Sequence, residues 1–137
     1  GRGITTEIWS VTSYGELRRE GLEFERIKRF DPKHEGVPYV EACFGDGVPT
    51  VAASDYIAAV PEMIQRWMKG EFLPLGTDGF GRSDTREELR RFFEVDSDSI
   101  VLASISLLER QGAIPPGSSA SFAEEAGLSY ERKDVTL

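Results

Sequence analysis

The residue types best suited to chemistry gather in one glycine-rich segment, residues 75–96. Its glycines follow the order G-x-x-G-x-G and precede a predicted helix at residues 85–93, for which Asp84 is a natural N-cap. Backbone amides in a glycine turn and at a helix N-terminus bind phosphate or carboxylate, and arginines add bidentate contacts. The segment is therefore a candidate anion-contact or interface site, formed by Gly79, Phe80, Gly81, Arg82, Asp84 and Arg86.

A simpler interpretation of the same segment competes with the anion site. The glycine order differs from the dinucleotide-binding fingerprint, and the lysine of a phosphate loop is missing. Asp78 and Asp84 also place negative charge beside the anion. We favour a tight turn that packs a strand against a helix, with Arg82, Arg86 and Arg90 as a solvated stripe. The alternative is a standalone binding module that uses the Gly79–Gly81 loop with Arg82 and Arg86 for an acidic ligand or partner.

The other reactive side chains predict no active site. His34 is the single histidine and lies in a polar connector, so no nucleophile is placed beside it. With one histidine and one cysteine, Cys43, only an all-carboxylate metal site is possible. We therefore predict no catalytic, cofactor-binding or metal-binding residues. Helix caps and solvated faces account for the paired carboxylates Glu23, Glu25, Asp96 and Asp98.

Composition indicates one globular domain and excludes several partners. The 137 residues are 39% hydrophobic and 29% charged, which is typical of a globular protein. The net charge of -8 disfavours a nucleic-acid partner. Neither a signal peptide nor an apolar run of about 20 residues is present, so we expect no membrane partner. The lone cysteine fits a reducing compartment, and we predict a cytoplasmic location.

Hydrophobic patterns predict an α/β domain. Strands are expected at residues 4–12, 50–53 and 72–75. The first is followed by a helix with Ser13 and Glu16 as a capping box, which Gly21 divides into two pieces. Trp9 and Trp67 are assigned to the core. Further helices are expected at residues 39–44, 57–68, 85–93 and 97–111, the second of them kinked at Pro61 or beginning there.

The order of elements predicts a largely parallel sheet with helices on both faces. We assign residues 4–116 to this domain and residues 117–137 to a loosely ordered tail. Three strands make a narrow sheet, so we expect a preceding strand and helix to be missing from this chain or supplied by a larger parent.

Several separated motifs resemble one family. They are IWSVTSY at residues 8–14, VPYV at 37–40, VAASDY at 51–56 and LGTDGFGRSDTR at 75–86. In this order they are similar to the C-terminal domain of the homodimeric pyruvate dehydrogenase first component, of the transketolase superfamily. The resemblance implies a three-layer α/β domain with a mainly parallel sheet, lacking the family's first strand and helix.

The resemblance also implies a function for the parent enzyme. Such an enzyme decarboxylates pyruvate on thiamine diphosphate and magnesium, and acetylates a lipoyl group of dihydrolipoyl acetyltransferase. The cofactor and the catalytic groups belong to the two preceding domains, so no catalytic residue is carried over to this chain. The implied role of these residues is to pack against the remaining domains and the second subunit of a homodimer.

Overall fold

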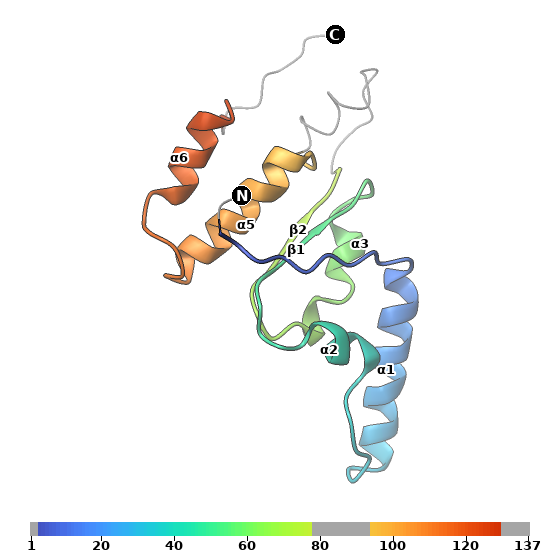
Figure 1. The fold of residues 1–137 in the computed structure, drawn as a ribbon. Helices are drawn as coiled ribbons and strands as arrows, with labels where there is room; N and C mark the ends of the chain where they lie inside the picture. Colours follow the sequence, from blue (N-terminus) through green and yellow to red (C-terminus); the bar gives the residue numbers. More distant parts are fainter. Residues whose placement is uncertain (1–2, 78–93, 130–137) are drawn as a thin grey trace.

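A computed structural model describes residues 3–77 and 94–129 of the chain, and it is an α/β fold. Two helices precede a strand–helix–strand unit, and two further helices follow it (Figure 1). In chain order the elements are α1 (Tyr14–Phe30), α2 (Tyr39–Phe44), β1 (Thr50–Ala53), α3 (Ala59–Glu62), the 3-10 helix η1 (Gln65–Trp67), β2 (Phe72–Leu75), α5 (Ser97–Arg110) and α6 (Ser118–Glu125). Across the described residues, no helix combines the length and hydropathy that crossing a bilayer requires.

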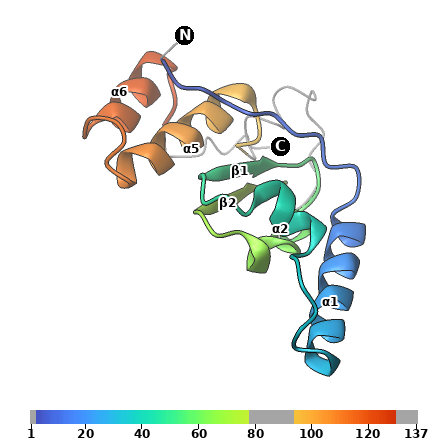
Figure 2. The same cartoon turned by 60° about the horizontal axis from the view of Figure 1, so that its bottom comes forward.

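The two strands form a parallel pair, as the sequence predicted. Thr50 lies opposite Phe72 and Ala53 lies opposite Leu75. Parallel neighbours need a crossover connection, which here contains α3 and η1. Helices α1 to α3 lie on one side of the pair, and α5 and α6 lie on the other (Figures 1 and 2). The fold is therefore α/β with helices on both sides of a parallel sheet.

A cluster of three buried side chains, Val40, Ile64 and Trp67, joins the crossover to α1 and α2. Gly21 is the one buried residue of α1, because the indole ring of Trp67 lies against its Cα. A Cβ atom at Gly21 would come within 2.4 Å of Trp67 Cζ2. The prediction that Gly21 divides this helix is wrong. The glycine instead lets an unbroken helix approach the tryptophan, at a helix-propensity cost of about 1 kcal/mol relative to alanine.

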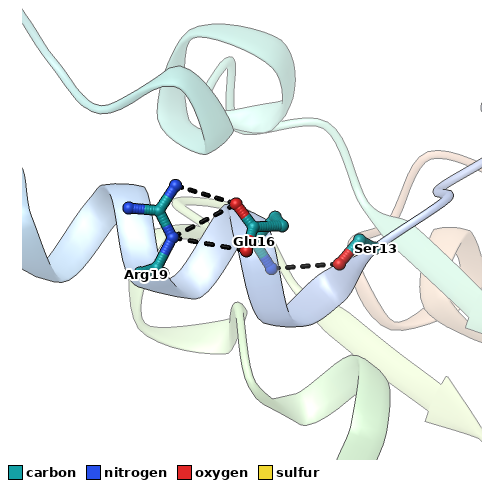
Figure 3. A network of polar contacts seen from close by, with 3 residues as sticks. All are labelled: Ser13, Glu16 and Arg19. Atoms are coloured by element: carbon teal, nitrogen blue, oxygen red, sulfur yellow. Dashed lines mark hydrogen bonds and ion pairs between the residues drawn. The ribbon is translucent and has the colours of Figure 1, made fainter.

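Half of the predicted capping box is formed at the start of α1. The Ser13 hydroxyl accepts a hydrogen bond from the Glu16 amide at 3.1 Å, as Figure 3 shows. The Glu16 carboxylate turns along the helix and accepts hydrogen bonds from Arg19, the shortest at 2.8 Å. These bonds and the charge of Arg19 lower the pKa of the Glu16 carboxyl group.

The predicted first strand is wrong. Residues 4–12 run from the side of α5 to the start of α1 without forming a helix or a ladder (Figure 1). A strand exists only beside another strand, and within the described residues this backbone has no such neighbour. Assigning Trp9 to the core is also wrong, because its side chain remains 49% exposed. Its ring meets that of Phe44 edge to face, with the ring centroids 5.1 Å apart and the planes at 74°.

The crossover between β1 and β2 contains two short helices, α3 and η1, where the sequence predicted one helix at residues 57–68. Pro61 lies in the first turn of α3, as one of the two alternatives expected, but the predicted helix at residues 57–68 is wrong beyond Glu62. The α-helix ends at Glu62, and the chain turns again as the 3-10 helix η1. This break carries both Ile64 and Trp67 into the core.

The expectation of a loosely ordered tail is wrong for residues 118–125, which form α6. Glu109 of α5 holds this helix by its N-terminus. Its carboxylate accepts hydrogen bonds from the Ser119 hydroxyl at 2.7 Å and the Ser119 amide at 3.3 Å. These bonds lower the pKa of the Glu109 carboxyl group. Its negative charge lies near the positive, N-terminal end of the α6 dipole and so stabilises the helix. The predicted helix at residues 85–93 and the segment 130–137 lie outside the described residues.

Replacing Gly21 by alanine is expected to lower the free energy of unfolding by about 1–3 kcal/mol, because the new methyl group overlaps a buried indole ring. Urea unfolding measures the change. Gly15→Ala is the matched control in the same helix, where the nearest atom to the new Cβ is 3.9 Å away. The control should gain about 0.5–1 kcal/mol. A Gly21→Ala variant as stable as the Gly15→Ala variant would contradict this packing.

Glu109→Gln is expected to speed amide hydrogen exchange in residues 118–125 at neutral pH, because the carboxylate that caps α6 is lost. In the unsubstituted chain this protection should be present above the ordinary glutamate pKa, about 4.3. It should be lost as the pH falls through the lower pKa of the folded state. Glu124→Gln removes the same charge from α6 itself and should leave the exchange unchanged. Equal exchange in both variants would show that Glu109 does not hold the helix.

Candidate functional site

The described part of the candidate site is the carboxyl edge of the β1–β2 pair. In α/β sheets this edge is where ligands usually bind, and here it leads into the glycine-rich segment. After β1 the chain continues through Ser54 to Ala58, and after β2 it continues through Gly76 and Thr77. The Ser54 amide donates to the Leu75 carbonyl oxygen at 3.0 Å, which extends the parallel ladder by one bond.

Thr77 fastens these two loops to each other. Its amide donates to the Tyr56 carbonyl oxygen at 2.9 Å, and its hydroxyl donates to the Asp55 carbonyl oxygen at 2.6 Å. The Tyr56 amide donates to the Ser54 hydroxyl at 3.0 Å. The amides of Ser54, Tyr56 and Thr77 are therefore all used within the chain. An anion site would instead leave such amides free to donate to a ligand.

Gly76 brings the two loops into direct backbone contact. A Cβ atom at this position would lie 2.4 Å from the Ala58 amide nitrogen and 2.7 Å from the Tyr56 carbonyl oxygen. Backbone atoms cannot move aside as a flexible side chain can, so only glycine fits without a shift. The first glycine of the motif thus serves close packing, which agrees with the tight-turn interpretation at this position. The sequence motif indicated a turn here, but the contact with residues 56–58 had no local signal.

The six candidate residues named from the sequence lie beyond this edge. Gly79, Phe80, Gly81, Arg82, Asp84 and Arg86 fall outside the described residues. Their role as an interface or anion contact therefore stays a prediction. Of the two residues that lead into them, Thr77 is hydrogen-bonded to the loop after β1, and Gly76 is in close backbone contact with that loop.

The single histidine and the single cysteine have structural contacts. The ring of His34 lies against Phe24 with centroids 5.0 Å apart, and its amide donates to the Asp31 carbonyl oxygen. Cys43 lies one turn after Tyr39 on α2. A hydrogen bond between the two side chains, together with the charge of the thiolate, raises the pKa of Tyr39. The described contacts place no nucleophile against His34.

Carboxylates in the described residues make caps and ion pairs. Asp96 accepts from the Ser99 amide at the start of α5, which confirms its predicted role as a cap. Glu25 pairs with Arg66 at 3.0 Å, and Glu23 is 3.7 Å from Arg26. Within residues 3–77 and 94–129, no group of three or more histidine, cysteine, aspartate or glutamate side chains is arranged to hold a metal ion.

Long-range polar contacts were missed from the sequence. The Glu20 carboxylate accepts from the Tyr39 amide at 2.9 Å and so caps α2 from α1. Glu71 pairs with Arg110 at 2.9 Å, which ties the chain just before β2 to the end of α5. Such partners are 19 or more residues apart, and no local pattern marks them. They hold helices in place, and none of them reaches the carboxyl edge.

Comparison with known proteins assigns this fold to a family. Residues 1–96 match the family model described as the transketolase-like TK C-terminal domain. The chain belongs to the transketolase C-terminal domain-like family. This agrees with the parallel strand pair and with the resemblance of the sequence motifs.

Similar proteins share one name. The pyruvate dehydrogenase E1 component of Mycolicibacterium smegmatis is 42% identical over 135 residues, which are 97% of this chain and 14% of that protein. The Pseudomonas aeruginosa E1 component is also 42% identical over 135 residues, 96% of the chain and 15% of that protein. The Escherichia coli K12 E1 component is 40% identical over 114 residues, which are 82% of this chain and 13% of that protein. The chain thus spans only about a seventh of the length of these relatives.

The described carboxyl edge does not fit thiamine diphosphate or its magnesium ion. A diphosphate needs free amide or cationic donors, and the amides of Ser54, Tyr56 and Thr77 already have partners. A magnesium ion needs oxygen ligands grouped together, and the described residues hold no such group. What this edge provides is a rigid joint between two loops.

Gly76→Ala is expected to lower the free energy of unfolding by about 1–3 kcal/mol, because the added methyl group overlaps backbone atoms of Ala58 and Tyr56. Urea unfolding of the chain measures this change. Thr77→Ser is the neighbouring control, since it keeps the hydroxyl that donates to Asp55 and adds no atoms. A Gly76→Ala variant no less stable than the Thr77→Ser variant would refute the close contact.

Proposed function

We propose that this chain is the C-terminal domain of a thiamine diphosphate-dependent pyruvate dehydrogenase E1 component. The parent would decarboxylate pyruvate and transfer the acetyl group to the lipoyl group of dihydrolipoyl acetyltransferase. The observation that carries the proposal is 42% identity over 97% of the chain to a protein of that name. In this proposal residues 4–116 are the domain proper, and its role is structural.

The contacts at the carboxyl edge support a structural role. Ser54, Tyr56 and Thr77 direct their amides to the chain itself, and Gly76 closes the two loops against each other. Such an edge holds the glycine-rich segment at a fixed starting point. We propose that Arg82 and Arg86 in that segment contact another subunit or domain, so that their loss weakens assembly before chemistry.

The proposal specifies partners and a compartment. The partners are the remaining domains of the parent chain, the second subunit of a homodimer and dihydrolipoyl acetyltransferase. Thiamine diphosphate and magnesium would be bound by those remaining domains. A cytoplasmic location is proposed because the enzyme uses soluble partners and because Cys43 is the only cysteine of the chain.

Isothermal titration of the 137-residue chain with thiamine diphosphate, in the presence of Mg²⁺, is expected to give no binding heat. The physical reason is that the amides of Ser54, Tyr56 and Thr77 at this edge already donate within the chain, and that the described residues hold no grouped metal ligands. The same titration of the protein encoded by the full native reading frame is the positive control and should show binding. Micromolar, magnesium-dependent binding to the 137-residue chain would contradict the proposal.

Inorganic phosphate in the same calorimeter separates the structural role from a standalone binding module. The module would bind phosphate through the Gly79–Gly81 amides, Arg82 and Arg86. The structural role predicts no heat with phosphate. Saturable phosphate binding that Arg82→Gln abolishes would favour the module.

A further inference from the structure

The C-terminal end of α1 points away from the sheet and from the other helices in both overall views (Figures 1 and 2). The first half of this helix packs on the core through Tyr14, Leu17 and Leu22. From position 26 to position 33, in contrast, every residue is exposed. Most of the stability of a protein helix comes from packing, and these residues, the α1 tip, contribute none of it.

The α1 tip, RIKRFDPK, is basic in an acidic chain. It holds four basic residues and one acidic residue, whereas the whole chain has a net charge of -8. Earlier in α1 the balance is reversed, since residues 14–25 hold two basic and four acidic residues. The one acid of the tip, Asp31, accepts a hydrogen bond from the Lys33 amide at 3.2 Å. Across residues 3–77 and 94–129, no ion pair involves Lys28, Arg29 or Lys33, so their charges are free for a partner.

A large apolar ring lies among these charges. Phe30, the last residue of α1, is 79% exposed, and the Arg26 guanidinium lies over its ring at 5.2 Å from the centroid. Interaction with the helix dipole accounts for Lys28 and Arg29 in the last turn. It does not account for an exposed phenylalanine beside them. Phenylalanine and arginine are enriched at protein–protein interfaces, so this combination indicates a contact surface.

We propose that the α1 tip is a docking surface for an acidic segment of a partner protein. An apolar side chain of that segment packs on Phe30, and its carboxylates lie against Lys28, Arg29 and Lys33. Charge-assisted hydrogen bonds to arginine give geometric specificity, and the basic side chains speed the encounter with an acidic partner. This surface is separate from the carboxyl edge and from the glycine-rich segment, so it goes beyond the proposed function.

Charge complementarity favours this occupant over others. In a symmetric pair of copies tip would meet tip, and like charges would be opposed. Long polyanions such as nucleic acid, and extended anionic membranes, would also face the rest of a chain whose net charge is -8. A short acidic segment contacts the α1 tip alone, and so gains the attraction without that repulsion.

Fluorescence anisotropy tests this surface with the protein encoded by the full native reading frame. The probe is a labelled synthetic peptide of repeated Glu-Glu-Leu-Phe, which should bind saturably and more weakly as salt is added. Arg29→Glu should raise the Kd at least about tenfold. Arg18→Glu, the same charge change at another exposed position of α1, is the matched control and should change it little. Phe30→Ala should also weaken binding, unlike Val48→Ala, which truncates another exposed apolar side chain.

Each other outcome overturns the inference. Equal effects of Arg29→Glu and Arg18→Glu would show that the peptide responds to net charge and not to the α1 tip. Binding by the 137-residue chain but not by the full protein would show that the parent itself covers the tip, with the proposed function intact. Binding to phosphatidylglycerol vesicles that Phe30→Ala abolishes, in place of peptide binding, would identify a lipid surface. The absence of saturable peptide binding to either protein would refute the docking surface.

Discussion

The parallel pairing of β1 with β2 is the constraint on which the rest of the structure depends. Parallel strands cannot be joined by a hairpin, so residues 54–71 must leave the sheet and return. That crossover delivers Pro61, Ile64 and Trp67 to the core, and α1 and α2 pack on it. Gly21 makes this packing possible, because any larger residue would overlap the indole ring of Trp67. The same pairing sets the carboxyl edge, where Gly76 and Thr77 join the loop after β1.

Local patterns were enough to predict the elements whose stability is local. The β-branched run at β1, the proline before α2 and the Asp96 cap of α5 all gave elements at the observed places. The predictions that failed needed partners far away in the sequence. A strand at residues 4–12 requires an edge that the two observed strands do not offer. Helix α6 depends on the carboxylate of Glu109, ten residues before its partner Ser119, and Gly21 is explained by Trp67.

The features of the candidate site were likewise predictable only where they depend on local sequence. A turn at Gly76 was evident from the glycine pattern, whereas its contact with Tyr56 and Ala58 followed from the pairing of the strands. The amides of Ser54, Tyr56 and Thr77 at the described part of this edge are bonded within the chain, which supports the tight turn that the sequence favoured. A closely packed edge, a largely exposed segment at residues 4–12 and relatives about seven times longer are together explained by one arrangement. In that arrangement, which we propose, this domain is a scaffold that is completed by the rest of a longer parent protein.

The most direct measurement of this central claim is an experimental structure of the protein encoded by the full native reading frame. The account predicts a strand from outside these 137 residues bonded to residues 4–12, with amide nitrogen to carbonyl oxygen distances of about 2.9 Å. It also predicts that Ile8 is covered by that strand or its neighbours. Residues 4–12 without a strand partner in the full chain, as they are here, would contradict it.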